Sequence, residues 1–280
     1  MTSTPEPSGS LSLVIPIHNE VEAILVVAAE IGRCLGSLSE PWDVIWIDDG
    51  STDGSREVLM SLSKPHRVVC LDRHVGQSAA IRAGAERSHS DWLGIIDGDG
   101  QADPADILRQ LAVARRDGCD LVGGIRARRA DHAIRRLSSW IANGVRSFVI
   151  GNTVRDAGCS TKVIRRSCLL ALPFFHGMQC FLPELVAAQG GRYTEMIVHH
   201  RPRLGGRAKY GIANRLFAGI RDLMGVRWLL ARQRSCQASE HGHAWTPRTE
   251  GPATEGSAVE APTSPAQQDS KTAAKGGLSG

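Results

Sequence analysis

Two carboxylates one residue apart, Asp97 and Asp99, stand at the end of an apolar run in the segment IIDGDGQADP (residues 95–104). Residues 93–96 are apolar or small, so the pattern predicts a buried strand that leads directly into these carboxylates. A turn or a helix cap needs one acidic side chain, and neighbouring carboxylates repel each other unless a cation lies between them. Gln101 adds an amide oxygen, and hard oxygen ligands suit Mg²⁺ or Mn²⁺, which commonly bridge to a substrate phosphate. The spacing therefore predicts a Mg²⁺ or Mn²⁺ site formed by Asp97, Asp99 and Gln101.

The elements that must position these carboxylates are short apolar runs that alternate with helical periodicity. Strands are predicted over residues 11–16, 42–47, 67–71, 92–97 and 120–124, and helices over residues 20–38, 55–63, 79–88 and 105–116. The runs are almost continuously apolar, as strands covered on both faces are, and the alternation predicts a parallel α/β sheet. After residue 124 the pattern predicts a helix over about 132–148, short strands, and a long amphipathic helix near 212–233.

Polar segments follow the predicted strands, and in open α/β sheets ligands bind beyond the carboxyl ends of the strands. The five segments are PIHNE (16–20), DDGSTDGS (48–55), DRHVGQSAA (72–80), DGDGQADP (97–104) and GIRARR (124–129). Four of them carry carboxylates, and all could face one crevice. For Asp53 and Ser55 a turn or a helix cap is the favoured interpretation. No GxGxxG follows the first strand and no GxxxxGK phosphate loop occurs, so a bound nucleotide must be held by carboxylates and a metal.

Charge is unevenly distributed along the 280 residues, although the net charge is only +4. The composition, 42% hydrophobic and 22% charged, is that of an ordinary globular protein of one or two domains. Between residues 196 and 235 one acid, Asp222, faces nine basic residues: Arg201, Arg203, Arg207, Lys209, Arg215, Arg221, Arg227, Arg232 and Arg234. A second basic cluster consists of Arg126, Arg128, Arg129, Arg135 and Arg136. Such excess suits an anionic partner, whether phosphate, lipid headgroup or nucleic acid.

The seven cysteines are an odd number without a CxxC pair, which argues against a disulfide framework or a zinc site and favours a reducing compartment. The first ten residues, MTSTPEPSGS, have neither the basic nor the apolar region of a signal peptide. No run reaches the ~18 apolar residues that a spanning helix needs. The sequence therefore predicts a protein that is not exported by this route and does not cross a membrane.

Six sequence blocks occur in the order found in family 2 glycosyltransferases. They are VIPIHNE, VIWIDDGSTDGS, GQSAAIRAG, DGDGQADPADI, RDAGCSTKVIRR and HHRPRLGGRAKYGIANRLFAGIRDLMGVRWL, and together they span about residues 11 to 232. Within that family the chain most resembles the dolichol-phosphate mannosyltransferase-like branch. The resemblance implies a GT-A fold, an α/β architecture whose mixed sheet is flanked by helices. It also implies inverting transfer of a hexose from a GDP- or UDP-sugar to a polyprenyl (dolichyl or undecaprenyl) phosphate, with Mg²⁺ or Mn²⁺ as cofactor.

The resemblance also implies roles for single residues. The nucleotide-sugar site falls on Pro16, His18, Glu20, Asp48, Asp49, Asp97, Gly98, Gln101, Arg136, Arg203 and Lys209. Asp99, Asp156 and Arg126 fall on catalytic positions, with Arg126 and Arg136 near the transferred sugar and the acceptor phosphate. Arg203 and Lys209 match a mobile loop that closes over the donor diphosphate. His18 replaces the more usual Tyr, which leaves the nucleotide base open, and Gly98 replaces the commoner Ala.

The expected domain organisation is a disordered N-terminus (1–10), a GT-A domain (11–234) and a disordered tail (235–280). The protein is expected to be cytoplasmic and peripheral at the inner face of the membrane. It would either bind the membrane surface itself or use a membrane-anchoring subunit, and no nucleic-acid partner is expected. The apolar face of the 212–233 helix would lie on anionic lipid or pack on the sheet.

Two other functions remain open on the sequence. A family 2 enzyme that acts on a sugar hydroxyl in polysaccharide synthesis would need a true general base. A non-catalytic subunit would bind nucleotide sugar or membrane without turnover, but such a subunit has no reason to keep Asp97, Asp99, Gln101 and Arg203.

Overall fold

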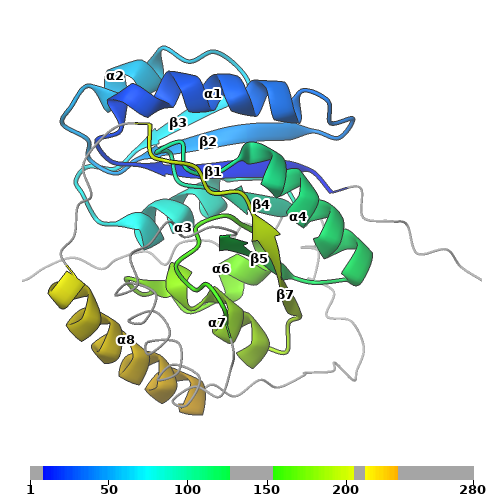
Figure 1. The fold of residues 1–280 in the computed structure, drawn as a ribbon, viewed down its shortest axis with the longest axis vertical. Helices are drawn as coiled ribbons and strands as arrows, with labels where there is room; N and C mark the ends of the chain where they lie inside the picture. The colour runs from blue at the N-terminus through cyan, green and yellow to red at the C-terminus, as the bar shows by residue number, and fades with distance from the viewer. Residues whose placement is uncertain (1–8, 127–153, 205–211, 233–280) are drawn as a thin grey trace, which may run out of the picture. The chain divides into compact units, whose positions relative to one another are not determined.

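A single mixed sheet of seven strands organises the part of the chain that the structure describes (Figure 1). The computed structural model describes residues 9–126, 154–204 and 212–232. The strands lie in the order β3-β2-β1-β4-β6-β5-β7. Their bounds are β1 Leu11–Ile17, β2 Trp42–Asp48, β3 His66–Cys70, β4 Trp92–Ile95, β5 Leu121–Arg126, β6 Lys162–Arg165 and β7 Tyr193–Val198. The helices are α1 Val21–Leu35, α2 Ser55–Met60, α3 Gln77–Arg87, α4 Pro104–Asp117, α6 Arg166–Ala171, the 3₁₀ turn η1 Met178–Cys180, α7 Leu182–Ala188 and α8 Ile212–Arg232.

One short strand makes the sheet mixed rather than parallel. β6 lies between β4 and β5 and runs antiparallel to both, whereas the pairs β1–β2, β1–β4, β2–β3 and β5–β7 are parallel. The alternation of strands and helices predicts only parallel neighbours, and that prediction is wrong at β4 and β5, which are each paired with the antiparallel β6 rather than with each other. The mixed sheet implied by the family resemblance is confirmed.

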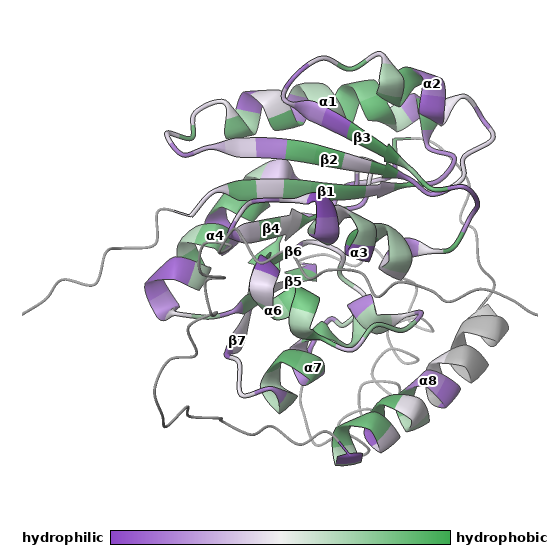
Figure 2. Ribbon diagram, turned by 180° about the vertical axis from the view of Figure 1, so that it is seen from behind, coloured by the Kyte–Doolittle hydropathy of each residue, from purple (hydrophilic) through white to green (hydrophobic). Residues whose placement is uncertain are grey.

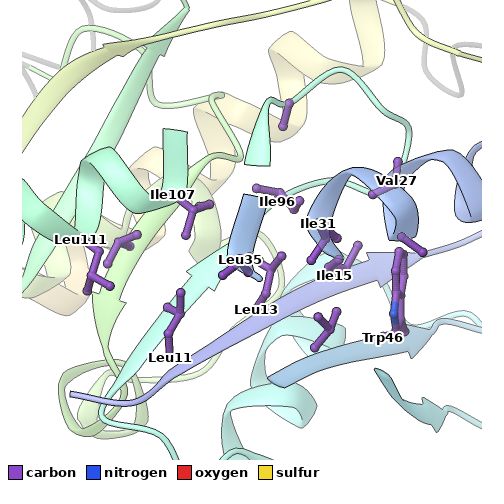
Figure 3. Packing of buried hydrophobic residues seen from close by; sticks show 14 of the residues in the cluster. Leu11, Leu13, Ile15, Val27, Ile31, Leu35, Trp46, Ile96, Ile107 and Leu111 are labelled. Carbon is purple, nitrogen blue, oxygen red and sulfur yellow. The ribbon is translucent and has the colours of Figure 1, made fainter. Parts of the chain in front are cut away.

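Two layers of helices cover the sheet, and each encloses its own apolar core. Helices α1, α2 and α4 cover one face, where Leu13, Ile15, Ile31 and Trp46 belong to a fully buried cluster (Figure 3). Helices α3, α6 and α7 cover the other face, together with the last turns of α8. Both faces of the central strands are therefore hydrophobic, while polar residues lie on the outer surfaces of the helices (Figure 2).

The first half of the chain folds close to the sequence prediction, with small differences at the ends of elements. The predicted helix over 20–38 ends at Leu35, and the predicted strand over 92–97 ends at Ile95. β4 stops there because its pairing with β6 ends at the Ile95–Lys162 pair. The two carboxylates therefore lie in the turn beyond the strand. The predicted helix over 132–148 and the tail over 235–280 lie outside the described residues, as does all of the N-terminal segment except residues 9 and 10.

Helix α8 divides its apolar residues between the core and the surface. Leu223 and Val226 are buried in the second core cluster, whereas the side chains of Met224 and Trp228 are 57% and 59% exposed. Packing on the protein, one of the two alternatives for this helix, thus accounts for one side of it. Among the described helices none is long and apolar enough to cross a membrane.

The contact between α3 and β1 gives a test of this packing. A Cβ added at Gly84 would lie 2.5 Å from Val14 Cγ1, whereas at Gly32 on α1 it would meet nothing within 4 Å. Gly84→Ala is therefore expected to lower the free energy of unfolding by about 1–2 kcal/mol, because overpacking exceeds the gain in helix propensity. Gly32→Ala should instead raise it by about 0.5–1 kcal/mol. Urea denaturation of both variants measures the difference, and equal stabilisation of both would contradict the close approach.

Candidate active site at the carboxyl edge of the sheet

The strand ends that carry the predicted site residues lie at one edge of the sheet. The carboxyl ends of β1, β2, β4 and β5 lie at this edge because β1, β2 and β4 are parallel neighbours and β6 runs antiparallel to both β4 and β5. For the same reason β6 begins here, with Lys162 opposite Ile95. The predicted site residues at the ends of β1, β2, β4 and β5 and in the segment before β6 therefore lie at one edge of the sheet, where the sequence allowed a single crevice.

The turn 97–101 holds the two predicted metal ligands in different surroundings. Asp97 accepts a hydrogen bond from Gln77 Nε2 at 2.6 Å. Asp99 is 5% exposed, and its Oδ1 accepts from the backbone N–H of Gln101 at 3.0 Å. Between them Gly98 lies close to β1, since a Cβ there would lie 2.0 Å from Ile17 Cδ1 and the Ile17 side chain would have to shift. The glycine thus lets the turn press against the end of β1.

A strap of residues 199–204 crosses this turn and brings two arginines to it. Its backbone pairs with the turn through Arg201 N–H to Gln101 O at 2.9 Å and Leu204 N–H to Asp99 O at 3.2 Å. Arg201 binds Glu30 with both terminal nitrogens, at 3.0 and 2.7 Å, and so ties the strap to α1. The strap is therefore held against the acidic turn by both backbone and side-chain bonds.

Arg203 bridges two acidic residues at the centre of the site. Its guanidinium lies 2.9 Å from Asp99 Oδ2 and 3.0 Å from Glu20 Oε1, and its side chain is 31% exposed. The guanidinium thus offsets the charge of Asp99 where the sequence predicts a metal ion. Glu20 and Arg203 were both predicted to bind the nucleotide sugar, and although they lie far apart in the sequence they form a direct ion pair.

The electrostatics of Asp97 follow from its enclosure. Burial raises the pKa of the Asp97 carboxyl above its usual range, and the charge of Asp99 raises it further. A hydrogen bond from Ser160 and the charges of Lys162 and Arg203 act in the opposite direction and lower it. The half-buried carboxylate is therefore subject to opposing effects, with burial and Asp99 disfavouring its charge and Ser160, Lys162 and Arg203 favouring it.

The donor set is suited to a hard divalent cation that brings other ligands with it. Asp97 and Asp99 offer carboxylate oxygens, and no group of three or more His, Cys, Asp or Glu side chains suited to a metal is found in the described part of the chain. Mg²⁺ is commonly bound by one or two carboxylates plus substrate phosphates and water, so two carboxylates fit such an ion. Gln101 Nε2 donates to Arg201 O at 3.2 Å, and its role as a third ligand stays a prediction.

Hydrogen bonds and ion pairs fix the predicted nucleotide residues at the ends of β1 and β2. Asp48 is fully buried and accepts from Arg56 Nε at 2.6 Å. Asp49 accepts from the backbone N–H groups of residues 75 and 76 at 2.7 and 2.8 Å and from His74 Nδ1 at 2.8 Å. His18 donates from Nδ1 to Asp49 O and stacks on His74 with ring centroids 3.9 Å apart. Both carboxylates thus shape the loops here, and Pro16 precedes them near the end of β1.

Asp156 and Arg126, predicted near the acceptor, form a two-pronged ion pair. Arg126 Nε and its terminal nitrogen NH2 each lie 2.8 Å from one carboxylate oxygen of Asp156, whose side chain is 6% exposed. Both carboxylate oxygens of Asp156 are thus engaged by the guanidinium. Arg136 and Lys209 lie outside the described residues.

Sequence reasoning missed several polar residues that surround Asp97. Gln77, Ser160, Lys162 and Gln179 line a cavity of about 50 Å³ together with Asp97. Lys162 is 4% exposed, and its ammonium donates to Cys159 O. The blocks GQSAAIRAG and RDAGCSTKVIRR contain three of these residues, so their place at a strand end was a usable signal. Gln179 gave no signal, because a lone glutamine far along the chain has no distinctive chemistry.

The chain matches a family model and is similar to proteins of known activity. Residues 12–172 match the model of glycosyl transferase family 2. The chain is 34% identical to a dodecaprenyl-phosphate galacturonate synthase of Rhizobium johnstonii, over 82% of this chain and 70% of that protein. It is 33% identical to an undecaprenyl-phosphate 4-deoxy-4-formamido-L-arabinose transferase of Yersinia enterocolitica, over 75% of this chain and 65% of that one. The chain thus spans about two thirds of the length of these relatives.

Solved structures of low identity share the architecture. One is glucosyl-3-phosphoglycerate synthase from Mycobacterium tuberculosis in complex with Mn²⁺, uridine-diphosphate-glucose and phosphoglyceric acid, with a TM-score of 0.62 and 18% identity over 82% of this chain and 83% of that chain. Another is mannosyl-3-phosphoglycerate synthase from Rubrobacter xylanophilus, with a TM-score of 0.62 and 13% identity over 84% of this chain and 79% of that chain. At this identity the likeness concerns the fold alone, and the predicted GT-A fold is confirmed.

The contact between Arg203 and Asp99 predicts a stability effect. Arg203→Gln leaves the buried Asp99 carboxylate without its cation and should lower the free energy of unfolding by about 1–2 kcal/mol. This is less than the roughly 3–5 kcal/mol of a fully enclosed pair, because the guanidinium is partly exposed. The control Arg116→Gln removes an exposed pair with Asp117 and should change little. Urea denaturation in the absence of divalent cations measures the free energy of unfolding of both variants. Equal losses in the two would contradict a stabilising role for the ion pair between Arg203 and Asp99.

Proposed function

Because the chain belongs to glycosyl transferase family 2, we propose that it transfers a sugar, with inversion, from a nucleotide-sugar donor to a polyprenyl phosphate and uses Mg²⁺ or Mn²⁺. The observation that carries this proposal is the pair Asp97 and Asp99 at the carboxyl edge, with Arg203 directly against it. The names of the two relatives support the acceptor class, since both refer to a polyprenyl phosphate. A hexose is the proposed sugar, carried by GDP or UDP.

The donor diphosphate is proposed to lie beside the acidic turn, next to the Arg203 guanidinium of the strap. Asp97 and Asp99 are the residues that would hold the cation, which when bound supplies charge neutralisation for the leaving diphosphate. Arg203 must then release Asp99, and its guanidinium can bind a phosphate oxygen instead. Lys209 is proposed to join it there. The base and ribose are assigned to the end of β1, near His18, which stacks on His74.

The acceptor is proposed to approach near Arg126. A phosphate monoester is already anionic near neutral pH, so the transfer needs little general-base help. It needs cations that hold two negatively charged molecules in line. The pair between Arg126 and Asp156 fits this need, because the carboxylate fixes the guanidinium in one orientation (both N–O distances 2.8 Å). Asp156 is thus proposed to orient Arg126 rather than to accept a proton.

The exposed side of α8 is proposed to contact the membrane in which such an acceptor resides. Met224 and Trp228 point away from the core, and Arg232 lies over the Trp228 ring at 4.6 Å. The side chain of Arg221 is 76% exposed. A helix with an interfacial Trp and basic flanks can lie on anionic lipid. We therefore favour direct contact at the cytoplasmic face over a membrane-anchoring subunit.

A transfer assay tests the reaction. Purified chain is incubated with radiolabelled GDP- and UDP-hexoses and with undecaprenyl phosphate, dolichyl phosphate, undecaprenol or an oligosaccharide. Label is expected in the lipid fraction only with the two phosphates. Asp97→Asn or Asp99→Asn should reduce it at least about 100-fold, and EDTA should abolish it until Mg²⁺ or Mn²⁺ is restored. Label on the oligosaccharide would favour transfer to a hydroxyl. Full activity in chelator would overturn the role of the two carboxylates.

Vesicle sedimentation tests the membrane contact. Binding to phosphatidylglycerol-containing vesicles should fall steeply between low and high salt, because attraction of surface arginines is screened. The triple variant Arg221→Gln, Arg227→Gln and Arg232→Gln should bind on the order of 100-fold more weakly, at about 1 kcal/mol per arginine.

A control variant carries the same charge change elsewhere. Arg33 on α1, Arg116 on α4 and Arg192 just before β7 are exposed, and replacing all three with Gln should leave vesicle binding close to that of the unmodified chain. If the two triple variants bind alike, or if the unmodified chain ignores anionic vesicles at low salt, the contact by α8 is wrong and an anchoring subunit is favoured.

A further inference from the structure

A chain of hydrogen bonds joins two distant segments of the sequence and ends on Asp97. Gly177 N–H donates to Ser78 Oγ at 2.9 Å, and the Ser78 hydroxyl donates to Gln179 Oε1. Gln179 Nε2 donates to Gln77 Oε1 at 3.2 Å, and Gln77 Nε2 donates to Asp97 Oδ1 at 2.6 Å. Every donor in this relay points toward the carboxylate.

We propose that Gln77 and Gln179 are positioning residues that hold Asp97 in the orientation required to bind the divalent cation. The inference rests on the proposed metal-dependent function and names two residues that it needs. A hydrogen bond from Gln77 fixes the Asp97 carboxylate but uses only one of the lone pairs on its two oxygens. The carboxylate can therefore be held and still bind a cation. Partners of this kind orient metal-binding carboxylates and tune the affinity of the site.

Gln179 is needed because an amide group can face its neighbour with either end. If the Gln77 amide turned over, its oxygen would face the Asp97 carboxylate and repel it. The N–H of Gln179 on Gln77 Oε1 prevents this turn. Gln179 is itself oriented by the Ser78 hydroxyl, whose proton is directed toward it because Ser78 accepts from Gly177. One backbone N–H thus sets the orientation of both amides.

The relay lies on rigid elements. Gln77 and Ser78 begin α3, and Gln179 lies in η1, where Met178 is 2% exposed. The two segments touch closely, since a Cβ at Gly76 would lie 2.7 Å from the His176 ring. Gln77, Gln179 and Asp97 line one small cavity and are half-buried, so their hydrogen bonds are partly shielded from water. A change in one amide is therefore transmitted to the carboxylate rather than absorbed by solvent.

Mn²⁺ binding tests the proposal without any need for a substrate. Purified full chain is titrated with Mn²⁺ alone, and the free ion is measured by electron paramagnetic resonance. Gln77→Leu is expected to weaken binding about 10–100-fold. Gln179→Glu keeps the shape and still accepts from Ser78 but cannot donate to Gln77, so a loss of about 3–10-fold is expected, below that of Gln77→Leu. Gln189→Leu removes a hydrogen bond from the side-chain amide to Ala171 O at the end of α6 and is the matched control, with no loss expected.

A double-mutant cycle shows whether the relay acts through Asp97. The loss caused by Gln77→Leu should largely vanish when Asp97 is already Asn, because the residue being positioned is gone. Additive losses, or wild-type affinity in both Gln77→Leu and Gln179→Glu, would overturn the relay while the metal site stands. Wild-type affinity in Asp97→Asn would overturn the metal site itself. Thermal unfolding verifies folding, and the near-isosteric Gln179→Glu remains informative if Gln77→Leu does not fold.

Discussion

The carboxylates of Asp97 and Asp99 lie close together just beyond β4, and side chains from several other segments offset their charges. Burial and the nearby Asp99 both disfavour the charged form of Asp97. The turn 97–101 contains no basic residue that could offset these charges. Asp97 is therefore met by Gln77, Ser160 and the charge of Lys162, and Asp99 by Arg203. Three segments far apart in the sequence thus supply the hydrogen bonds and positive charges that stabilise the acidic turn.

The direction of β6 follows from the same constraint. Lys162 is the first residue of β6 and pairs with the last residue of β4, so its ammonium is placed beside the acidic turn. If β6 ran parallel to β4, Lys162 would start at the opposite edge, roughly 10 Å away for a strand of four residues at about 3.3 Å each. The antiparallel strand thus delivers a buried cation and the Ser160 hydroxyl to an edge that otherwise carries mainly carboxylates.

Sequence reasoning located the acidic turn but not the groups that support it. β1 and β2 were predicted to within about one residue because continuous apolar runs mark strands buried on both faces. β6 has only four residues, too few for periodicity to mark. Asp97 and Asp99 stand out because two adjacent charges need an explanation. Gln77 and Gln179 do not, since they lie 102 residues apart and only the fold brings their amides together.

Arg203 connects the two ligands of the proposed reaction through one ion pair. In the structure it offsets Asp99 at 2.9 Å, where a cation would have to bind. A metal ion alone would have to displace this guanidinium into a position with only Glu20 as partner, and a diphosphate alone would draw it away from a buried carboxylate. With both bound, Asp99 would hold the cation and Arg203 would bind a phosphate oxygen, so that both charged side chains would keep a partner of opposite charge. The proposed function therefore implies that metal and donor bind cooperatively, because each removes the electrostatic cost that the other creates.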